Sequence, residues 1–546
     1  MPRIHIGRDR SAGRAGKPAA IFFLACTFIF FPPPTYASQA KRTPPRQTAP
    51  TRAPRNVKRR IQSILDSKGA KDAQWGIQVI SLRRGESVFS WNPDKHFVPA
   101  STAKLFTTAA ALVRLGPEFK YLTTVEATGP VDEKGAVHGD LILVGRGDPN
   151  LSGRVLPYNG RTERSSQPMK VFEDLADEVS SRGIRVVDGD LVADDSYFVN
   201  QPYGEGWTVG DMFWGYGAPV SALSANDNVV TFTILPGQRA GDRAIVEQGP
   251  MDRYFDVINR VLTVGGRGAP SSGAASNTER RIAFDRRPGS RVLSLWGRIP
   301  AGEVGLTESV AVDEPSRFAG EFFRLALERR GIQIHGTLQL RHLEPVDVPD
   351  LRSPWQAPRA STTNVIASHQ SRPLIESLKV TEKVSQNLHA EMLLRTLGRE
   401  RRQVGSVEAG LEEVNQFLRE IGVNESDVAL RDGSGLSRQT LVSPSAAATL
   451  LKAMYNSRER SSWIDLLPVA GVDGSLRDRL QDPKVQGRIH AKTGSLAGVA
   501  ALIGYYIEEN REPLAFAIFM NNGNLPEAAA RTLIDRIAVE IARGPE

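Results

Sequence analysis

The stretch that most constrains this chain is an apolar helical segment at 105–115, with a proline before it and a Gly-Pro pair after it. Because proline cannot occupy a helix interior, Pro99 predicts that the helix begins near Ser101. Ser101 and Lys104 are three residues apart, so they share one helix face, and the lysine amine can reach the serine hydroxyl.

A serine hydroxyl needs a neighbouring group to accept its proton before it attacks a carbonyl. Lysine serves as that base only while it is neutral, and burial in apolar surroundings favours the neutral form. The apolar helix offers such surroundings, so the Ser-x-x-Lys spacing indicates a nucleophile with an adjacent base. Taken alone, the spacing is also compatible with a solvated helix start.

The amino terminus has the pattern of a secretory signal. Basic residues precede an apolar run at 19–31, and three prolines and small residues follow it. We expect residues 1–37 to be a signal peptide that directs secretion across the inner membrane to the periplasm, with an uncleaved anchor as the alternative. Residues 38–56, rich in proline and basic side chains, are predicted to be a disordered tether that contacts anionic lipid or wall polymer.

The charge balance gives no sign of nucleic-acid binding. Residues 1–60 hold 13 of the 69 basic residues and one acidic residue, which leaves 56 Lys and Arg against 60 Asp and Glu. The folded part is therefore slightly acidic, so nucleic acid is not an expected partner. Cys26, the only cysteine, lies in the apolar run, and a cleaved protein would have no disulfide, Cys-ligated zinc or catalytic thiol.

Strand patterns occupy the middle of the chain and helical patterns surround them. Short β-branched runs separated by Gly and Asp fill residues 119–351. Within this stretch, 145–228 is richer in aromatic and turn residues, and 265–277 is expected to be a mobile Gly/Ser/Ala loop. Beyond it, the sequence predicts helices at 373–384, 388–397 and 406–421, then three strands and a final helix.

Two further polar clusters lie downstream of the serine and lysine. The Ser-Gln-Asn tripeptide at 385–387 falls between two predicted helices, at a corner that can project side chains into a cleft. The Lys-Thr-Gly-Ser sequence at 492–495 lies in a predicted strand, where a cation and hydroxyls can bind a substrate carboxylate. Its glycine, Gly494, lets another backbone approach closely.

These three clusters occur in the same order in the active-site serine penicillin-recognising enzymes, which the chain resembles. Ser101 and Ser385 are 284 positions apart, whereas Asn387 and Lys492 are 105 apart, so a large insertion separates the first two clusters. This spacing resembles the class C low-molecular-mass penicillin-binding proteins, the D-alanyl-D-alanine carboxypeptidase/endopeptidase family. Other stretches similar to that family lie at 144–150, 217–223, 385–391, 432–437, 467–473 and 487–495.

The resemblance implies an α+β fold with a β-lactamase/DD-peptidase-like catalytic domain, an antiparallel sheet flanked by helices. Residues 57–118 and 352–546 would form this discontinuous domain. A mostly-β insertion of two nested domains would interrupt it. The expected domain II comprises 119–144 and 229–351, and the expected domain III comprises 145–228.

The resemblance also implies the chemistry. Ser101 would form an acyl-enzyme, Lys104 would act as the base, and Ser385 would relay the proton to the leaving amine. The N–H groups of Ser101 and Ser495 would hold the oxyanion. The substrate-binding residues would be Asn387, Lys492, Thr493, Gly494 and Ser495, with no metal or cofactor required. The expected partners are peptidoglycan stem peptides ending in D-Ala-D-Ala or carrying D,D-crosslinks, with β-lactams as covalent inhibitors.

Two alternatives use the same fold. A β-lactamase must deacylate quickly, and in its class A type this requires a Glu-x-x-Leu-Asn loop, which the sequence lacks; the nearest match, at 412–415, lies within a helical pattern. A non-catalytic peptidoglycan-binding or scaffold protein would not need all three clusters intact.

Overall fold

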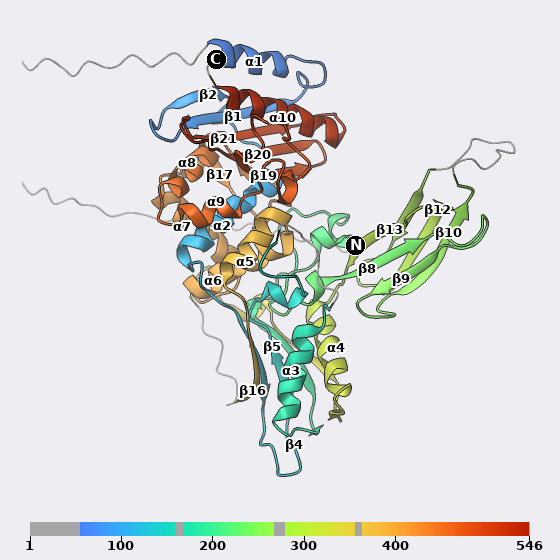
Figure 1. Cartoon of the computed structure of the whole chain (residues 1–546). Coiled ribbons are helices and arrows are strands. Elements are labelled where there is room, and N and C mark those ends of the chain that lie inside the picture. Colours follow the sequence, from blue (N-terminus) through green and yellow to red (C-terminus); the bar gives the residue numbers. More distant parts are fainter. Residues whose placement is uncertain (1–54, 160–166, 267–278, 355–362, 545–546) are drawn as a thin grey trace, which may run out of the picture. The chain divides into compact units, whose positions relative to one another are not determined.

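The computed structural model describes residues 55–159, 167–266, 279–354 and 363–544 (Figure 1). The predicted signal peptide, all but two residues of the predicted tether and most of the predicted mobile loop lie outside these ranges. Within the described ranges, no helix combines the length and the apolar character needed to cross a membrane.

Segments from both ends of the chain form one antiparallel sheet of five strands, in the order β19-β20-β21-β1-β2 (Figure 1). Its strands are β1 (Gln74–Ser81), β2 (Ser87–Trp91), β19 (Ile489–Leu496), β20 (Val499–Tyr506) and β21 (Leu514–Asn521). The early strand β1 pairs with β21, and Ile77 lies opposite Ile518. Every residue of β20 and β21 is buried, because helices cover both faces of the sheet.

The helices on the two faces are α1 (Arg55–Leu65), α2 (Lys104–Arg114), α8 (Pro444–Tyr455), α9 (Arg460–Leu466) and α10 (Glu527–Arg543). Neighbouring strand residues point to opposite faces. Accordingly, Leu502 and Ile518 share a core with α1 and α10, whereas Ile503 and Phe519 share a core with α2 and α8. The helix that follows the nucleophile thus packs directly on the sheet that carries the third polar cluster.

The predicted helices after residue 354 are present. They are α5 (Leu374–Lys379), which a π-helical turn (Val380–Val384) continues, α6 (Asn387–Arg402) and α7 (Val407–Glu420), and a short hairpin follows, β17 (Val428–Ala429) with β18 (Leu441–Val442). The predicted helix at 388–397 is too short, since α6 continues through Gly398 to Arg402. A Cβ at position 398 would lie 2.9 Å from the backbone nitrogen of Gly410 in α7. This glycine therefore allows close helix packing instead of ending a helix.

The insertion begins with a mixed five-stranded sheet in the order β15-β7-β5-β3-β16. Its strands are β3 (Leu122–Ala127), β5 (Leu141–Val144), β7 (Leu191–Val199), β15 (Leu338–Leu343) and β16 (Asn364–Gln370). A small parallel sheet accompanies it, β4 (Ala136–Val137), β6 (Val186–Val187) and β14 (Gln333–Ile334). The helices of this part are α3 (Lys170–Ser181) and α4 (Pro315–Glu328).

The rest of the insertion consists of two three-stranded sheets, β13-β8-β9 and β10-β12-β11. Their strands are β8 (Val229–Leu235), β9 (Ile245–Gly249), β10 (Asp256–Val264), β11 (Arg281–Asp285), β12 (Val292–Pro300) and β13 (Leu306–Ala311). This division differs from the expected domain boundaries. Strand β5 of expected domain II pairs with β7 of expected domain III, because strands far apart in sequence complete one sheet, while 229–311 forms sheets of its own.

Candidate active site

Ser101 lies in a 3₁₀ turn, Ala100–Ala103, that leads into α2. The α-helix itself begins at Lys104, three residues later than Pro99 alone suggested. The Lys104 Nζ lies 2.9 Å from the Ser101 Oγ, the contact that the sequence spacing predicted. Lys104 is fully buried, whereas Ser101 is half-buried, so the hydroxyl faces the cavity and the amine lies beneath it.

The Lys104 ammonium has two other acceptors. It donates to Asn387 Oδ1 at 2.6 Å and to the carbonyl oxygen of Ser434 at 2.8 Å. All three acceptors are uncharged. The first residue of α6 and the loop after β17 therefore hold the lysine from two sides.

Ser385 and Lys492 form the second half of the site. Ser385 follows the π-helical turn in a left-handed conformation, with φ of 66°, which turns the chain from α5 into α6. Lys492 on β19 donates to Ser385 Oγ at 2.7 Å and to the carbonyl of Thr493 at 2.9 Å. Ser385 is thus hydrogen-bonded to Lys492, while Lys104 is bonded to Asn387.

Burial controls the protonation of both lysines. Loss of solvation, with repulsion from Lys492 as the next cause, lowers the pKa of Lys104 to about 7. Burial also lowers the pKa of Lys492 to about 8, opposed by the Glu382 carboxylate. Near neutral pH a large share of Lys104 is therefore neutral, as a proton acceptor must be.

The strand cluster lies directly against the nucleophile turn. A Cβ at Gly494 would lie 2.6 Å from the carbonyl oxygen of Pro99, so glycine is needed for this approach. The Thr493 hydroxyl is 2.8 Å from Ser475 Oγ. Ser495 lines a cavity of about 790 Å³ together with Ser101, Ser385 and Asn387. The three clusters, distant in sequence, therefore converge on one cavity.

The same cavity has lining residues that the sequence analysis did not assign to the site: Asp211, Tyr216, Leu436, Arg438 and Leu496. Asp211 and Tyr216 belong to the aromatic-rich part of the insertion, and Leu436 belongs to the loop at 432–437. The aromatic enrichment and the loop were visible in the sequence, but neither pattern said that they reach the nucleophile. The insertion therefore forms part of the cavity wall.

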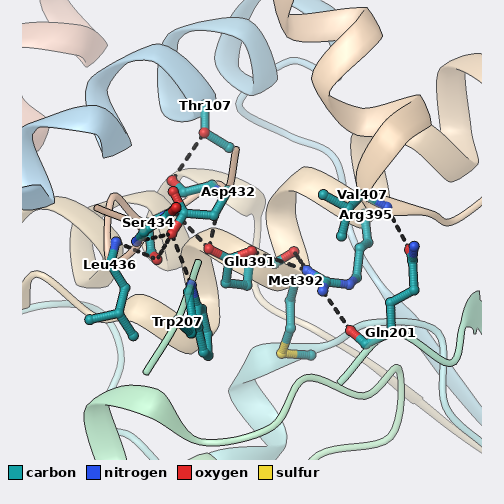
Figure 2. Close-up of polar contacts among 12 residues, drawn as sticks. Thr107, Gln201, Trp207, Glu391, Met392, Arg395, Val407, Asp432, Ser434 and Leu436 are labelled. Atoms are coloured by element: carbon teal, nitrogen blue, oxygen red, sulfur yellow. Dashed lines mark hydrogen bonds and ion pairs between the residues drawn. The ribbon is translucent and has the colours of Figure 1, made fainter. Parts of the chain in front are cut away.

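The loop at 432–437 is folded around buried carboxylates (Figure 2). Asp432 accepts from the N–H of Gly435 at 3.0 Å and of Ser437 at 2.7 Å. Glu391 of α6 accepts from the N–H of Gly433 and Ser434 at 2.9 and 2.8 Å. These bonds fix the carbonyl that Lys104 uses. Within the described ranges, no group of three or more His, Cys, Asp or Glu side chains is placed to bind a metal ion.

Comparison with known proteins gives consistent results. A family model described as D-Ala-D-Ala carboxypeptidase 3 (S13) family matches residues 57–543. A D-alanyl-D-alanine carboxypeptidase of an Actinomadura species is 34% identical over 492 residues, covering 88% of this chain and 84% of its own length. The carboxypeptidase DacB of Haemophilus influenzae is 26% identical over 473 residues, covering 86% and 90%.

The solved structures agree on the fold. Penicillin binding protein 4 of Haemophilus influenzae superposes with a TM-score of 0.73 at 24% identity, covering 88% of this chain and 98% of that one. A second structure of that protein, complexed with a β-lactam, gives 0.68 at 22% identity, with 90% and 100% covered. The predicted α+β, DD-peptidase-like architecture is confirmed.

Proposed function

The chain belongs to the D-Ala-D-Ala carboxypeptidase 3 (S13) family, and from this premise we propose that Ser101, Lys104 and Ser385 carry out its reaction. It is a serine peptidase of the D-alanyl-D-alanine carboxypeptidase type. The observation that carries the assignment is the 2.9 Å contact between the Ser101 hydroxyl and a buried lysine surrounded by uncharged acceptors.

In the first step, neutral Lys104 accepts the Ser101 proton as Oγ attacks the carbonyl between the two terminal residues of the stem peptide. The new C–O bond gives a tetrahedral intermediate, whose oxyanion the N–H groups of Ser101 and Ser495 stabilise. The C–N bond then breaks, and the leaving amine takes up the proton through Ser385. Water hydrolyses the acyl-enzyme, releasing the shortened peptide as a carboxylic acid and restoring the serine.

Lys492 and the hydroxyls of Thr493 and Ser495 bind the terminal carboxylate of the substrate, and Gly494 allows their strand to approach the nucleophile. Lys492 remains charged below its pKa of about 8, so it supplies the positive charge that binds the carboxylate. Lys104 supplies the base. Asn387 Oδ1 accepts a hydrogen bond from Lys104, and Asn387 Nδ2 donates one to the Tyr216 carbonyl at 2.7 Å. Its main role is therefore to orient the base.

The substrates in this proposal are peptidoglycan stem peptides ending in D-Ala-D-Ala and, through endopeptidase activity, D,D-crosslinks. β-Lactams acylate Ser101 covalently because they present a reactive amide to the same nucleophile. The secretory pattern of residues 1–37 supports a periplasmic location. Residues 57–118 and 352–546 supply all eight site residues, which supports their assignment as the discontinuous catalytic domain, except for β16, which pairs with β3 of the insertion.

The deciding experiment is labelling with a fluorescent penicillin, compared between the wild type and Ser101→Ala. We expect labelling of the wild type alone. Equal labelling of both proteins, or of neither, would reject the nucleophile assignment. Mass spectrometry of digested muropeptides then measures loss of terminal D-alanine and of crosslinks. Unchanged peptides, despite penicillin labelling, would favour a binding or scaffold role.

A further inference from the structure

Hydrogen bonds connect the insertion to the residues that hold the catalytic base. Lys104 has two acceptors besides Ser101, the Asn387 amide oxygen and the Ser434 carbonyl. Both belong to the predicted catalytic domain. Each of them, however, is held in place by hydrogen bonds that lead to residues 201–216 of the insertion, along three separate routes.

The first route passes through a tryptophan. The buried indole of Trp207 donates to Asp432 Oδ2 at 3.0 Å (Figure 2). The same carboxylate accepts from the N–H groups that close the 432–437 loop and from the Thr440 hydroxyl at 3.0 Å. Asp432 is 1% exposed, so water does not readily replace a lost donor. The insertion thus provides one of the bonds around which the loop carrying Ser434 is folded.

The second route passes through a buried ion pair. Glu391 accepts from the Ser434 N–H and pairs with Arg395 at 3.2 Å. Arg395 in turn donates to the carbonyl of Gln201 at 2.7 Å (Figure 2). The insertion holds one nitrogen of the Arg395 guanidinium through the Gln201 carbonyl. The other nitrogen is thereby fixed against Glu391, and Glu391 in turn holds the N–H of Ser434 in the loop.

The third route sets the direction of an amide. Asn387 Nδ2 donates to the Tyr216 carbonyl at 2.7 Å. A carbonyl accepts and cannot donate, so it selects the NH₂ end of the side chain and leaves Oδ1 to face Lys104. A charged Lys104 also selects Oδ1, but a neutral amine can accept a hydrogen bond, so the Tyr216 carbonyl keeps the NH₂ group turned away from the base in its reactive form.

From these three routes, we propose that residues 201–216 of the insertion are positioning elements for the catalytic base, with Trp207 as the decisive side chain. The proposal rests on the role of Lys104 assigned above. The insertion is therefore part of the acylation machinery, and loss of the Trp207 indole bond slows attack by Ser101 while the nucleophile, the base and the residues lining the cavity are all still present.

The test compares two tryptophans that each donate one buried indole hydrogen bond. Trp207→Phe removes the bond to Asp432. Trp463→Phe is the matched control, because Trp463 on α9 is fully buried and its indole donates to the Tyr505 hydroxyl at 2.9 Å, away from the loop. Penicillin acylation is followed to its plateau in both full-length proteins, so unfolded molecules lower the amplitude and leave the rate constant unchanged.

We expect Trp207→Phe to acylate roughly ten- to a hundredfold more slowly, the range for a catalytic group displaced by up to about 1 Å, and Trp463→Phe to acylate at the wild-type rate. Equal rates for Trp207→Phe and the wild type would overturn the proposal, as would equal slowing of both variants. Absence of wild-type labelling at Ser101 would instead reject the proposed function, and it is detected before any variant is compared.

A second readout distinguishes positioning from a general loss of stability. Lys104 is faced by Lys492, Glu382, Asp432 and Glu391. Moving the Ser434 carbonyl or the Asp432 carboxylate away from Lys104 weakens interactions that favour the ammonium form. The rise of the acylation rate with pH should therefore shift to lower pH in Trp207→Phe. An unshifted pH profile would contradict the proposal.

Discussion

Two lysines of the catalytic region are buried to a similar degree and have opposite surroundings. Lys104 contacts only uncharged oxygens, those of Ser101, Asn387 and Ser434. Lys383, two residues before Ser385, lies 2.5 Å from the Asp473 carboxylate, with side chains 5% and 17% exposed. Only Lys104 contacts the nucleophile, so only Lys104 is arranged as a base.

The difference shows that burial by itself does not produce a proton acceptor. Burial disfavours the charged form of any lysine, but a carboxylate in contact restores the preference for the cation. Around Lys104 the nearby acids Glu382, Glu391 and Asp432 form none of the hydrogen bonds described for its ammonium, and they only partly offset burial and Lys492. Its pKa therefore falls to about 7, and a buried lysine surrounded by neutral acceptors becomes a base.

The largest expected effect is the slowing of acylation when Lys104 is replaced by arginine. A guanidinium keeps the positive charge but cannot lose its proton in a protein. Penicillin acylation should slow by about 10³-fold, within the range typical of a lost general base. Stopped-flow or gel fluorescence measures the rate, and a value within tenfold of the wild type would show that the charge matters and the proton transfer does not.

Asn387→Asp would give Lys104 the kind of contact that Lys383 has. A carboxylate within hydrogen-bond distance raises the pKa of the lysine, so fewer molecules carry a neutral base at pH 7. Acylation should slow by about 10- to 100-fold there, as expected for a shift of one to two pH units, and should recover as the pH rises. Equal slowing at every pH would show that the loss is geometric.

The pH profile of the wild type should have two limbs. Acylation rises as Lys104 loses its proton near pH 7 and falls as Lys492 loses its charge near pH 8. Lys492→Met removes a like charge that lowers the pKa of Lys104, so the rising limb should move to higher pH. Rates of acylation across pH test this, and an unmoved limb would show that the two lysines titrate independently.

Lys383→Met gives the smallest expected effect on catalysis. Acylation should stay within about threefold of the wild type, because Lys383 contacts none of the proposed reacting groups. The free energy of unfolding should fall by about 3 kcal/mol, since Asp473 loses its buried partner. Urea denaturation measures the loss. A large loss of acylation with little loss of stability would reverse the roles assigned to the two lysines.

The sequence was most informative where chemistry is local. The Ser101–Lys104 contact follows from their spacing of three residues, although a 3₁₀ turn and the start of α2 provide it and not one continuous α-helix. The corner at 385–387 follows from the two helices beside it. It was less informative about Gly398, because a glycine that allows close packing looks the same in sequence as one that ends a helix. The domain boundaries were also missed, since pairing between β5 and β7 depends on strands separated by a helix.

The part of the cavity wall outside the three polar clusters could not be predicted from the sequence. Asp211, Tyr216 and Arg438 reach the nucleophile through loops from separate parts of the chain, and no periodic pattern marks such convergence. Trp207 lies in the aromatic-rich stretch at 145–228, and nothing in the sequence distinguishes it from the other aromatic residues there. Its meaning depends on the indole lying 3.0 Å from Asp432, which is a property of tertiary packing.

The pairing of β1 with β21 has a consequence for biosynthesis. The strand at 74–81 has no sheet partner on one side until residues 514–521 have been made, and Lys492 also belongs to this late segment. An unfinished chain carries its serine and lysine early but cannot assemble the cleft around them. The complete active site therefore forms only after the last strands have closed the sheet.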